Sequence, residues 1–323
     1  MFFAPPQPIE TEVFARLPDH LRVTGRRSGW AFGKGHDFLH SFLEGPSFDR
    51  EGNLLVVDIP YGRVLRVSPA GEWSVITEYG GWPNGLKLHA DGRAFIADHR
   101  RGIMQLDLAT GAVTPVLETV RREGFKGAND LVFAANDDLY FTDQGQTGLQ
   151  DPSGRVYRLR SDGRVDCLLD NVPSPNGIVL SPDESALFVA ATRANQIWRL
   201  PLHPDGTTSK VAAFITLSGG LAGPDGLAMD EQGGLAVAHC GLGAVWLFDR
   251  LGQPRYRVNS CAGISTTNLA YGGPDNRSLF ITESDTGAIL RAEVPVAGAP
   301  MFSDRDLSAG SPSAARTPSR PPG

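Results

Sequence analysis

Short apolar stretches alternate with polar turns along most of the chain. In one example, the apolar residues Ile178 to Leu180 precede the turn Ser181 to Asp183, and a second apolar run covers Leu187 to Ala190. A third stretch, from Asn195 to Leu202, alternates between apolar and polar residues. Alternation with a turn after about 8 to 12 residues is typical of consecutive antiparallel hairpins. The pattern therefore predicts an all-β fold.

The same unit occurs six times along the chain. Its copies begin at positions 44, 84, 129, 176, 225 and 268, so the steps between them are 40, 45, 47, 49 and 43 residues. A period of about 45 residues lies in the range of a propeller blade. Each copy supplies three of the four strands that a blade needs. We therefore expect a six-bladed β-propeller, with an open sandwich of similar strands as the alternative.

A fourth strand follows each of the first five copies but not the sixth. The missing strand is expected near the N-terminus, because the segment 11–17 (TEVFARL) has the pattern of a fourth strand. Its pairing with the last blade closes the ring and removes an exposed edge. The predicted propeller domain is 1–302, including a long surface or lid loop at 19–43. The segment 303–323, rich in Ser, Pro, Ala and Arg, is predicted to be a disordered tail.

The first residue of each copy is expected at one mouth of the central channel, because the first strand of every blade lines that channel. All six are carboxylates or carboxamides, namely Glu44, Asn84, Asn129, Asn176, Asp225 and Asn268. A ring of oxygen donors with two negative charges suits a hard divalent cation. Asn-Gly and Asp-Gly are also common turn dipeptides, so a single copy would carry no weight. The repetition in six copies favours a metal site.

A second ring of residues is expected around the same mouth. The second strand of each blade runs antiparallel to the first, so its last residue lies beside the start of the first strand. These last residues are Asp58, Asp98, Asp143, Ala191, His239 and Glu283. They are candidates for orienting ligands or for moving protons. Capping of turns is the alternative, chiefly for Asp58 and Asp98.

Composition narrows the setting in which the protein works. A net charge of −6 gives no electrostatic reason to expect nucleic acid or an anionic membrane as a partner. No apolar run reaches the roughly 18 residues of a membrane-spanning helix, and the N-terminus does not read as a signal peptide. The three cysteines are widely spaced, so we expect free thiols, buried or half-buried, in a reducing compartment. The expected location is the cytoplasm, and the oligomeric state is left open.

Four motifs occur in a familiar order: EGPSFD, NDLVF with LYFTD, SPNGIVLSPDE and PDGLAMDEQGGLAVA. They resemble the gluconolactonase and senescence-marker-protein (regucalcin-like) family of six-bladed propeller lactonases, and also the squid phosphotriesterase. The resemblance runs from about Thr11 to Val296. It implies one divalent metal ion in the channel, most often Ca²⁺, with Zn²⁺, Mn²⁺ or Mg²⁺ as alternatives. The implied ligands are Glu44, Asn129, Asn176 and Asp225.

The chain departs from this family in two places. Members of the senescence-marker type carry an arginine two residues before the first ligand asparagine, where this chain has Gly127. Bacterial gluconolactonases tend to read FTDP after the second strand of the third blade, and this chain reads FTDQGQTG. The implied metal site carries over, whereas recognition of a sugar lactone in particular does not follow.

The implied activity is metal-dependent hydrolysis of a small lactone. A metal ion acts as the Lewis acid on the carbonyl oxygen, and a carboxylate takes the proton of the attacking water. Asp225 is expected to be this base as well as a ligand, with Asp143 or His239 as alternates. The predicted substrate contacts are Trp82, Asn84, His99, Asp143, His239 and Asn268.

Two other functions remain open. A phosphotriester could be hydrolysed at the same metal site, with Asp225 attacking phosphorus directly. A non-catalytic propeller that acts as an interaction scaffold or as a calcium binder is the other alternative, although an interaction scaffold does not need a ring of oxygen donors. The sequence has no GxSxG motif, P-loop or dinucleotide fingerprint, which disfavours serine esterase, ATPase and dehydrogenase functions.

Overall fold

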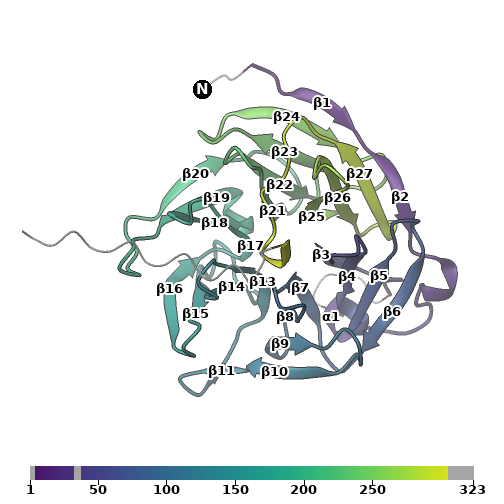
Figure 1. The fold of residues 1–323 in the computed structure, drawn as a ribbon, viewed down its shortest axis with the longest axis horizontal. Helices are drawn as coiled ribbons and strands as arrows, with labels where there is room; N and C mark the ends of the chain where they lie inside the picture. The colour runs from purple at the N-terminus through teal and green to yellow at the C-terminus, as the bar shows by residue number, and fades with distance from the viewer. Residues whose placement is uncertain (1–3, 33–37, 305–323) are drawn as a thin grey trace, which may run out of the picture.

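The computed structural model describes residues 4–32 and 38–304. In these residues six sheets surround a central channel, and each runs from an inner strand at the channel to an outer strand at the rim (Figure 1). The predicted six-bladed propeller is confirmed. A separate two-stranded sheet, β11 (Thr119–Val120) with β12 (Glu123–Gly124), follows the second blade.

Each blade starts at the channel and adds its strands outward in sequence order. Blade one holds β3 (Leu43–Phe48), β4 (Leu54–Asp58), β5 (Arg63–Val67) and β6 (Trp73–Glu78). Blade two holds β7 (Pro83–Leu88), β8 (Ala94–Asp98), β9 (Gly102–Leu106) and β10 (Val113–Leu117). Blade three holds β13 (Ala128–Phe133), β14 (Leu139–Asp143), β15 (Gly154–Leu159) and β16 (Val165–Val172).

The other three blades follow the same plan. Blade four holds β17 (Pro175–Leu180), β18 (Ala186–Ala191), β19 (Gln196–Pro201) and β20 (Ala212–Thr216). Blade five holds β21 (Gly223–Met229), β22 (Leu235–Cys240), β23 (Ala244–Phe248) and β24 (Pro254–Asn259). Blade six holds β25 (Thr266–Gly272), β26 (Ser278–Glu283) and β27 (Ala288–Glu293).

Apolar side chains hold neighbouring blades together. Val57 of β4 shares an apolar cluster with Leu86 of the next blade, while its neighbour Val56 shares one with Ala270 of blade six. Successive residues of a strand point to opposite faces, so a single strand contributes to the core on both sides. This explains why second strands such as LLVVD are apolar without alternation. Full burial of one such side chain contributes about 1.5–3 kcal/mol relative to exposure.

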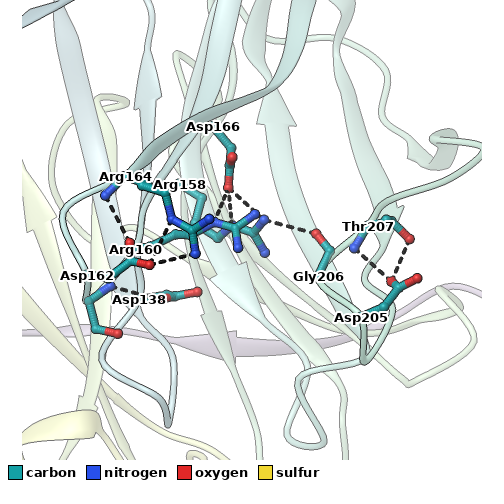
Figure 2. Close-up of polar contacts among 10 residues, drawn as sticks. Asp138, Arg158, Arg160, Asp162, Arg164, Asp166, Asp205, Gly206 and Thr207 are labelled. Atoms are coloured by element: carbon teal, nitrogen blue, oxygen red, sulfur yellow. Dashed lines mark hydrogen bonds and ion pairs between the residues drawn. The ribbon is translucent and has the colours of Figure 1, made fainter.

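A polar cluster adds to these contacts at the border of blades three and four. Asp166 of β16 accepts hydrogen bonds from Arg158 Nη2 (2.7 Å) and Arg160 Nε (2.7 Å) (Figure 2). Arg158 also donates to the carbonyl of Gly206 in blade four, over 2.9 Å. Partly exposed ion pairs contribute little to stability. The bond to Gly206 therefore matters mainly because it joins two blades.

The N-terminal segment closes the ring, as predicted. β2 (Glu12–Arg16) pairs antiparallel with β27 and completes blade six. A second segment, β1 (Gln7–Glu10), was not predicted to be a strand. It pairs in parallel with β24 and becomes a fifth strand of blade five. Its short sequence has no clear alternation, so only the free edge of β24 makes it a strand.

The inner strands share one register except for a correction in blade six. In blades one to five, the residue before each predicted ring residue pairs with the residue predicted for the second ring in the same blade. In blade six this pair is Thr266 with Glu283. Thr267 is therefore the equivalent of Glu44, and Asn268 lies one position later. The predicted alignment was wrong by one residue because β25 and β26 are each one residue longer than the strands of blade one.

Two segments outside the blades contribute residues to the cavities at the two channel mouths, Trp30 to one and residues 299–303 to the other. In the predicted loop 19–43, η1 (Asp19–Leu21) and α1 (Gly29–Phe32) are described, and the Trp30 ring contacts Phe42 with centroids 4.7 Å apart. Residues 33–37 lie outside the described residues. At the other mouth, the segment ending in η4 (Phe302–Asp304) crosses the centre of the ring, yellow in Figure 1. The positions 303 and 304 thus belong to η4, and the rest of the predicted tail lies outside the described residues.

Two of the three cysteines are less buried than expected. All three thiols are free, but Cys167 and Cys261 are exposed and only Cys240 is partly buried. The expectation of buried thiols was therefore wrong for two of them, because they lie on the outer strand β16 and on the loop after β24. Among the described residues, no helix has the length and apolar character needed to cross a membrane.

Candidate metal and substrate site

Five of the six predicted ring residues meet at one mouth of the channel. They line a cavity of about 430 Å³ and are buried, with 3% to 8% of each residue exposed: Glu44, Asn84, Asn129, Asn176 and Asp225. The β-ladder shifts register just after each of them. Such irregularities re-aim side chains beside functional sites. The five inner strands share the same pairing register and the same shift in the ladder, and this places the five side chains on one wall of the cavity.

Hydrogen bonds orient two of these side chains, and one oxygen of each accepts no hydrogen bond from the described residues. Glu44 Oε2 accepts hydrogen bonds from the Gly45 amide (2.8 Å) and Asn268 Nδ2 (2.9 Å). Asn129 Nδ2 donates to Gln144 Oε1 over 2.9 Å. Within residues 4–32 and 38–304, no hydrogen bond reaches Glu44 Oε1 or Asn129 Oδ1. Both oxygens can therefore take a ligand in the cavity.

The charges of the site favour a cation. Burial raises the pKa of Glu44 well above its ordinary value of 4.5, and the neighbouring Asp225 carboxylate raises it further. Two carboxylates held together in a buried site repel each other, and a divalent cation would offset this repulsion. The described residues contain no group of three or more His, Cys, Asp or Glu that could hold a metal ion. A cation here would therefore depend on Asn129 and Asn176 as well as on the two carboxylates.

The carboxylates of the predicted second ring cap turns. Asp58 Oδ1 accepts a hydrogen bond from the Phe42 amide (2.7 Å), and Asp98 Oδ1 accepts one from the Arg100 amide (2.8 Å). Glu283 Oε1 likewise accepts one from the Asp285 amide (2.7 Å). The alternative considered for Asp58 and Asp98 is thus what the structure shows. These side chains fix the loops around the mouth instead of facing the cavity.

Four of the predicted substrate contacts do not line the cavity: Trp82, Asp143, His239 and Asn268. Asp143 Oδ1 accepts a hydrogen bond from the Gly127 amide over 2.8 Å. The ring of His239 is fully buried, with Nε2 3.2 Å from the Gly219 carbonyl and Nδ1 3.2 Å from Trp246 Nε1. Asp143 and His239 are thus held by neighbouring groups of the protein. The predicted contacts that line the cavity are Asn84 and His99.

His99 accounts for the glycine at position 127. A Cβ on Gly127 would lie 2.3 Å from His99 Cε1, and the residue has a φ of +156°. No side chain fits there while the imidazole is in place. The family resemblance predicts an arginine at position 127. The His99 ring, which lines the cavity, covers this position instead.

Sequence reasoning missed much of the wall. The loop after β14 supplies Gln144, Gln146 and Leu149, and the segment 29–32 supplies Trp30. The only signal for that loop was its departure from the FTDP pattern. Arg193 of η3 (Thr192–Ala194) is exposed and is the single Lys or Arg side chain among the described residues of the wall.

Known proteins resemble the chain over most of its length. A family model described as SMP-30/Gluconolactonase/LRE-like region matches residues 42–285. A curated gluconolactonase from Zymomonas mobilis is 30% identical over 283 residues, which cover 77% of this chain and 78% of the relative. A lactonase, drp35 from Staphylococcus aureus, is 32% identical over 226 residues, covering 66% and 68% of the two chains.

Solved structures show the same propeller. A calcium-binding protein, regucalcin from Agrobacterium tumefaciens, superposes with a TM-score of 0.73 at 24% identity and covers 92% of this chain and 99% of its own. A gluconolactonase from Xanthomonas campestris superposes with a TM-score of 0.71 at 24% identity, over 90% and 98% of the two chains. At such identities the superpositions establish the fold alone.

Proposed function

Because the chain belongs to the SMP-30/gluconolactonase/LRE-like family, we propose that it is a metal-dependent hydrolase that opens the ring of a small lactone. One observation carries the proposal, namely that Glu44, Asn129, Asn176 and Asp225 converge on one cavity. The relatives named gluconolactonase and lactonase support a lactone as the substrate class.

These four side chains would hold one divalent cation. Ca²⁺ is the first choice because all the donors are oxygens and two of them are neutral carboxamides. When bound, the cation would supply Lewis acidity that polarises the lactone carbonyl and stabilises negative charge on its oxygen. Gln144 would keep the carboxamide of Asn129 turned so that Oδ1, and not Nδ2, faces the cation.

Asp225 is the base in this proposal. Asp143 and His239 lie off the cavity wall, and Glu44 Oε2 already accepts two hydrogen bonds. The Asp225 carboxylate takes a proton from a water molecule while the water oxygen bonds to the carbonyl carbon. The ring C–O bond then breaks, and the proton passes to the departing alkoxide oxygen. The product is the open-chain hydroxy acid.

The rest of the wall provides contacts for the substrate ring and its substituents. Trp30 and Leu149 offer apolar surface, while Asn84 and Gln146 offer polar groups for hydroxyls. Arg193 offers a positive charge for an acidic substituent. The wall therefore suits a small lactone that is partly apolar and carries polar or anionic substituents.

The test is hydrolysis of a panel of compounds by the metal-stripped and the reloaded protein. The panel contains glucono-δ-lactone, an aromatic lactone, a lactone with a carboxylate, and a phosphotriester. We expect lactone hydrolysis that EDTA abolishes and that Ca²⁺, Zn²⁺, Mn²⁺ or Mg²⁺ restores. Asp225→Asn should lower kcat by at least about 100-fold, whereas Asp205→Asn, an exposed carboxylate in a loop of blade four, should leave it unchanged.

Each alternative predicts a different result. Cleavage of the phosphotriester without lactone hydrolysis would favour the phosphotriesterase function. Calcium binding without hydrolysis of any compound in the panel would favour the non-catalytic propeller. Full lactonase activity after removal of the metal, or in Asp225→Asn, would contradict the proposed roles of the cation and of Asp225.

A further inference from the structure

One position of the inner strands, directly after the ring residues, differs between blades. Four blades have glycine there: Gly45, Gly85, Gly177 and Gly226. Blade three has Asp130, and blade six has Asn268 after the register is corrected. Both side chains are buried, with 1% and 2% of the residue exposed. In a ring of six blades, the third and the sixth stand opposite each other.

Asp130 and Asn268 are held in the same way. The Asp130 amide donates to Thr142 Oγ1, and the Asn268 amide donates to Thr282 Oγ1, both over 3.0 Å. Oδ1 of each side chain accepts a hydrogen bond from the next amide in its strand, both over 2.8 Å. The shared pattern shows that the two residues are structural equivalents. Both side chains therefore start from matching points on opposite sides of the channel.

The two side chains lie close to each other, and Asn268 also reaches Glu44. Asn268 Nδ2 donates to Glu44 Oε2 over 2.9 Å. Burial raises the pKa of Asp130, and the nearby Asn268 carboxamide acts in the opposite direction. The carboxamide of Asn268 thus lies between two carboxylates. We call Asp130 and Asn268 the crossbar. Neither side chain lines the cavity at the metal mouth or the second cavity, of about 400 Å³, at the opposite mouth.

The glycines give independent support for the crossbar. A Cβ on Gly85 would lie 2.7 Å from Asp130 Oδ1, and a Cβ on Gly226 would lie 2.1 Å from Asn268 Oδ1. Neither glycine has a positive φ, so turn geometry does not require glycine there. Their lack of a side chain leaves the space that the crossbar fills.

Charges are arranged in two layers along the channel. Glu44 and Asp225 face the metal mouth, and Asp130 lies close enough to both layers to interact with Glu44 on one side and with Lys87 on the other. Lys87 lines the cavity at the opposite mouth. The crossbar therefore lies between two charged regions of the channel. On one side are the carboxylates of Glu44 and Asp225, which suit a divalent cation, and on the other is Lys87, whose positive charge balances Asp130.

We propose that Asp130 and Asn268 are positioning residues that hold the Glu44 carboxylate in the orientation needed for binding the divalent cation. Asn268 fixes Oε2, so that Oε1 stays turned to the cavity, and the nearby Asp130 carboxylate favours the orientation of the Asn268 carboxamide in which Nδ2 is the donor. This inference rests on the proposed metal site, and it assigns a role to two residues that do not line the cavity.

The test is the Ca²⁺ dissociation constant, measured by titration calorimetry on the full chain after chelation. Asn268→Ala removes the donor to Glu44, and we expect Ca²⁺ to bind about tenfold more weakly or worse, the scale of one hydrogen bond to a charged group. Asp130→Asn keeps the shape of the side chain and should weaken binding several-fold. The matched control is Asn259→Ala, which removes a similar Asn-to-carboxylate bond, to Glu10 (2.7 Å), at the rim; its Ca²⁺ affinity should equal that of the wild type.

The melting temperature of the metal-free protein separates positioning from folding. A purely structural role would lower this temperature in Asn268→Ala and Asp130→Asn while leaving the dissociation constant unchanged, and that result would overturn the crossbar proposal while the metal site stands. Wild-type protein that binds no divalent cation would overturn the metal site and the crossbar together. Weaker binding in both variants, with Asn259→Ala unchanged, supports the proposal.

Discussion

Single residues in this propeller take their roles from small differences in position. Asp225 and His239 belong to the same blade, and His239 pairs with Pro224, the residue before Asp225. Even so, Asp225 lies on the cavity wall, while His239 is fully buried behind it. The Trp246 indole donates to Nδ1 of His239, so the neutral ring carries its proton on Nε2 and donates to the Gly219 carbonyl. A second proton on Nδ1 would break the bond to Trp246.

Burial lowers the pKa of His239 below its ordinary value of 6.5, although the Gly219 carbonyl acts in the opposite direction. The unfolded chain therefore takes up the proton first as the pH falls. The stability due to neutral His239 is complete above about pH 6.5 and is lost as the pH falls through the lower pKa of the folded state. We expect the free energy of unfolding to decrease between pH 7 and pH 5, measured by urea titration at each pH.

His239→Gln should weaken this pH dependence. His20→Gln, which changes an exposed histidine, should leave the dependence as it is in the wild type. An equal pH dependence in all three proteins would show that the buried imidazole is not responsible.

At the scale of elements, closure of the ring depends on a strand from the other end of the chain. β2 covers the edge of β27, and Leu17, directly after β2, is only 1% exposed and packs in the cluster that joins blades six and one. The amide of Leu17 donates to the Gly287 carbonyl over 2.8 Å. The apolar contact and the hydrogen bond attach the N-terminal segment at the point where the ring closes.

Leu17→Ala should lower the free energy of unfolding by about 2–5 kcal/mol, because it removes a buried side chain and leaves a cavity. Leu251→Ala, at a leucine that is 64% exposed, is the matched control and should change it by less than about 0.5 kcal/mol. Urea unfolding followed by tryptophan fluorescence measures both. Equal stabilities of the two variants would mean that this contact does not support closure.

At the scale of the whole molecule, the two mouths of the channel differ. One mouth carries the candidate site. The other is crossed by the segment from Ala299 to Ser303, which lines the second cavity together with inner strands of all six blades. Phe302 stacks on Phe133 with centroids 5.2 Å apart and lies 4.9 Å from the His89 ring. Because this segment also packs on blades four to six through Ala299 and Met301, it braces the ring at the mouth opposite the candidate site.

Phe302→Ala should destabilise the protein by about 1–3 kcal/mol, since the aromatic contacts are lost but the side chain is only partly buried. Ca²⁺ affinity should not change, because Phe302 lies at the mouth opposite Glu44. Thermal unfolding and calorimetric titration measure the two quantities. Leu221→Ala, at a leucine that is 81% exposed, serves as the control for stability. A large loss of Ca²⁺ affinity would mean that the two mouths are coupled.

The sequence by itself determined the number of blades, the order of the strands and the ring of Glu44, Asn84, Asn129, Asn176 and Asp225. These features repeat, and they follow from alternation and turn chemistry within about 45 residues of chain. Closure by the segment 11–17 was also predictable, because five fourth strands for six copies left one place to fill.

Only the tertiary structure decided the features that need contacts between distant segments. The parallel pairing of β1, the segment at the far mouth and the wall residues after β14 have no local pattern to reveal them. Asn268 shows the reason most clearly. Its place in the repeat predicted a sixth ring residue, but the strand lengths of blade six move it one position along, where its carboxamide donates a hydrogen bond to Glu44.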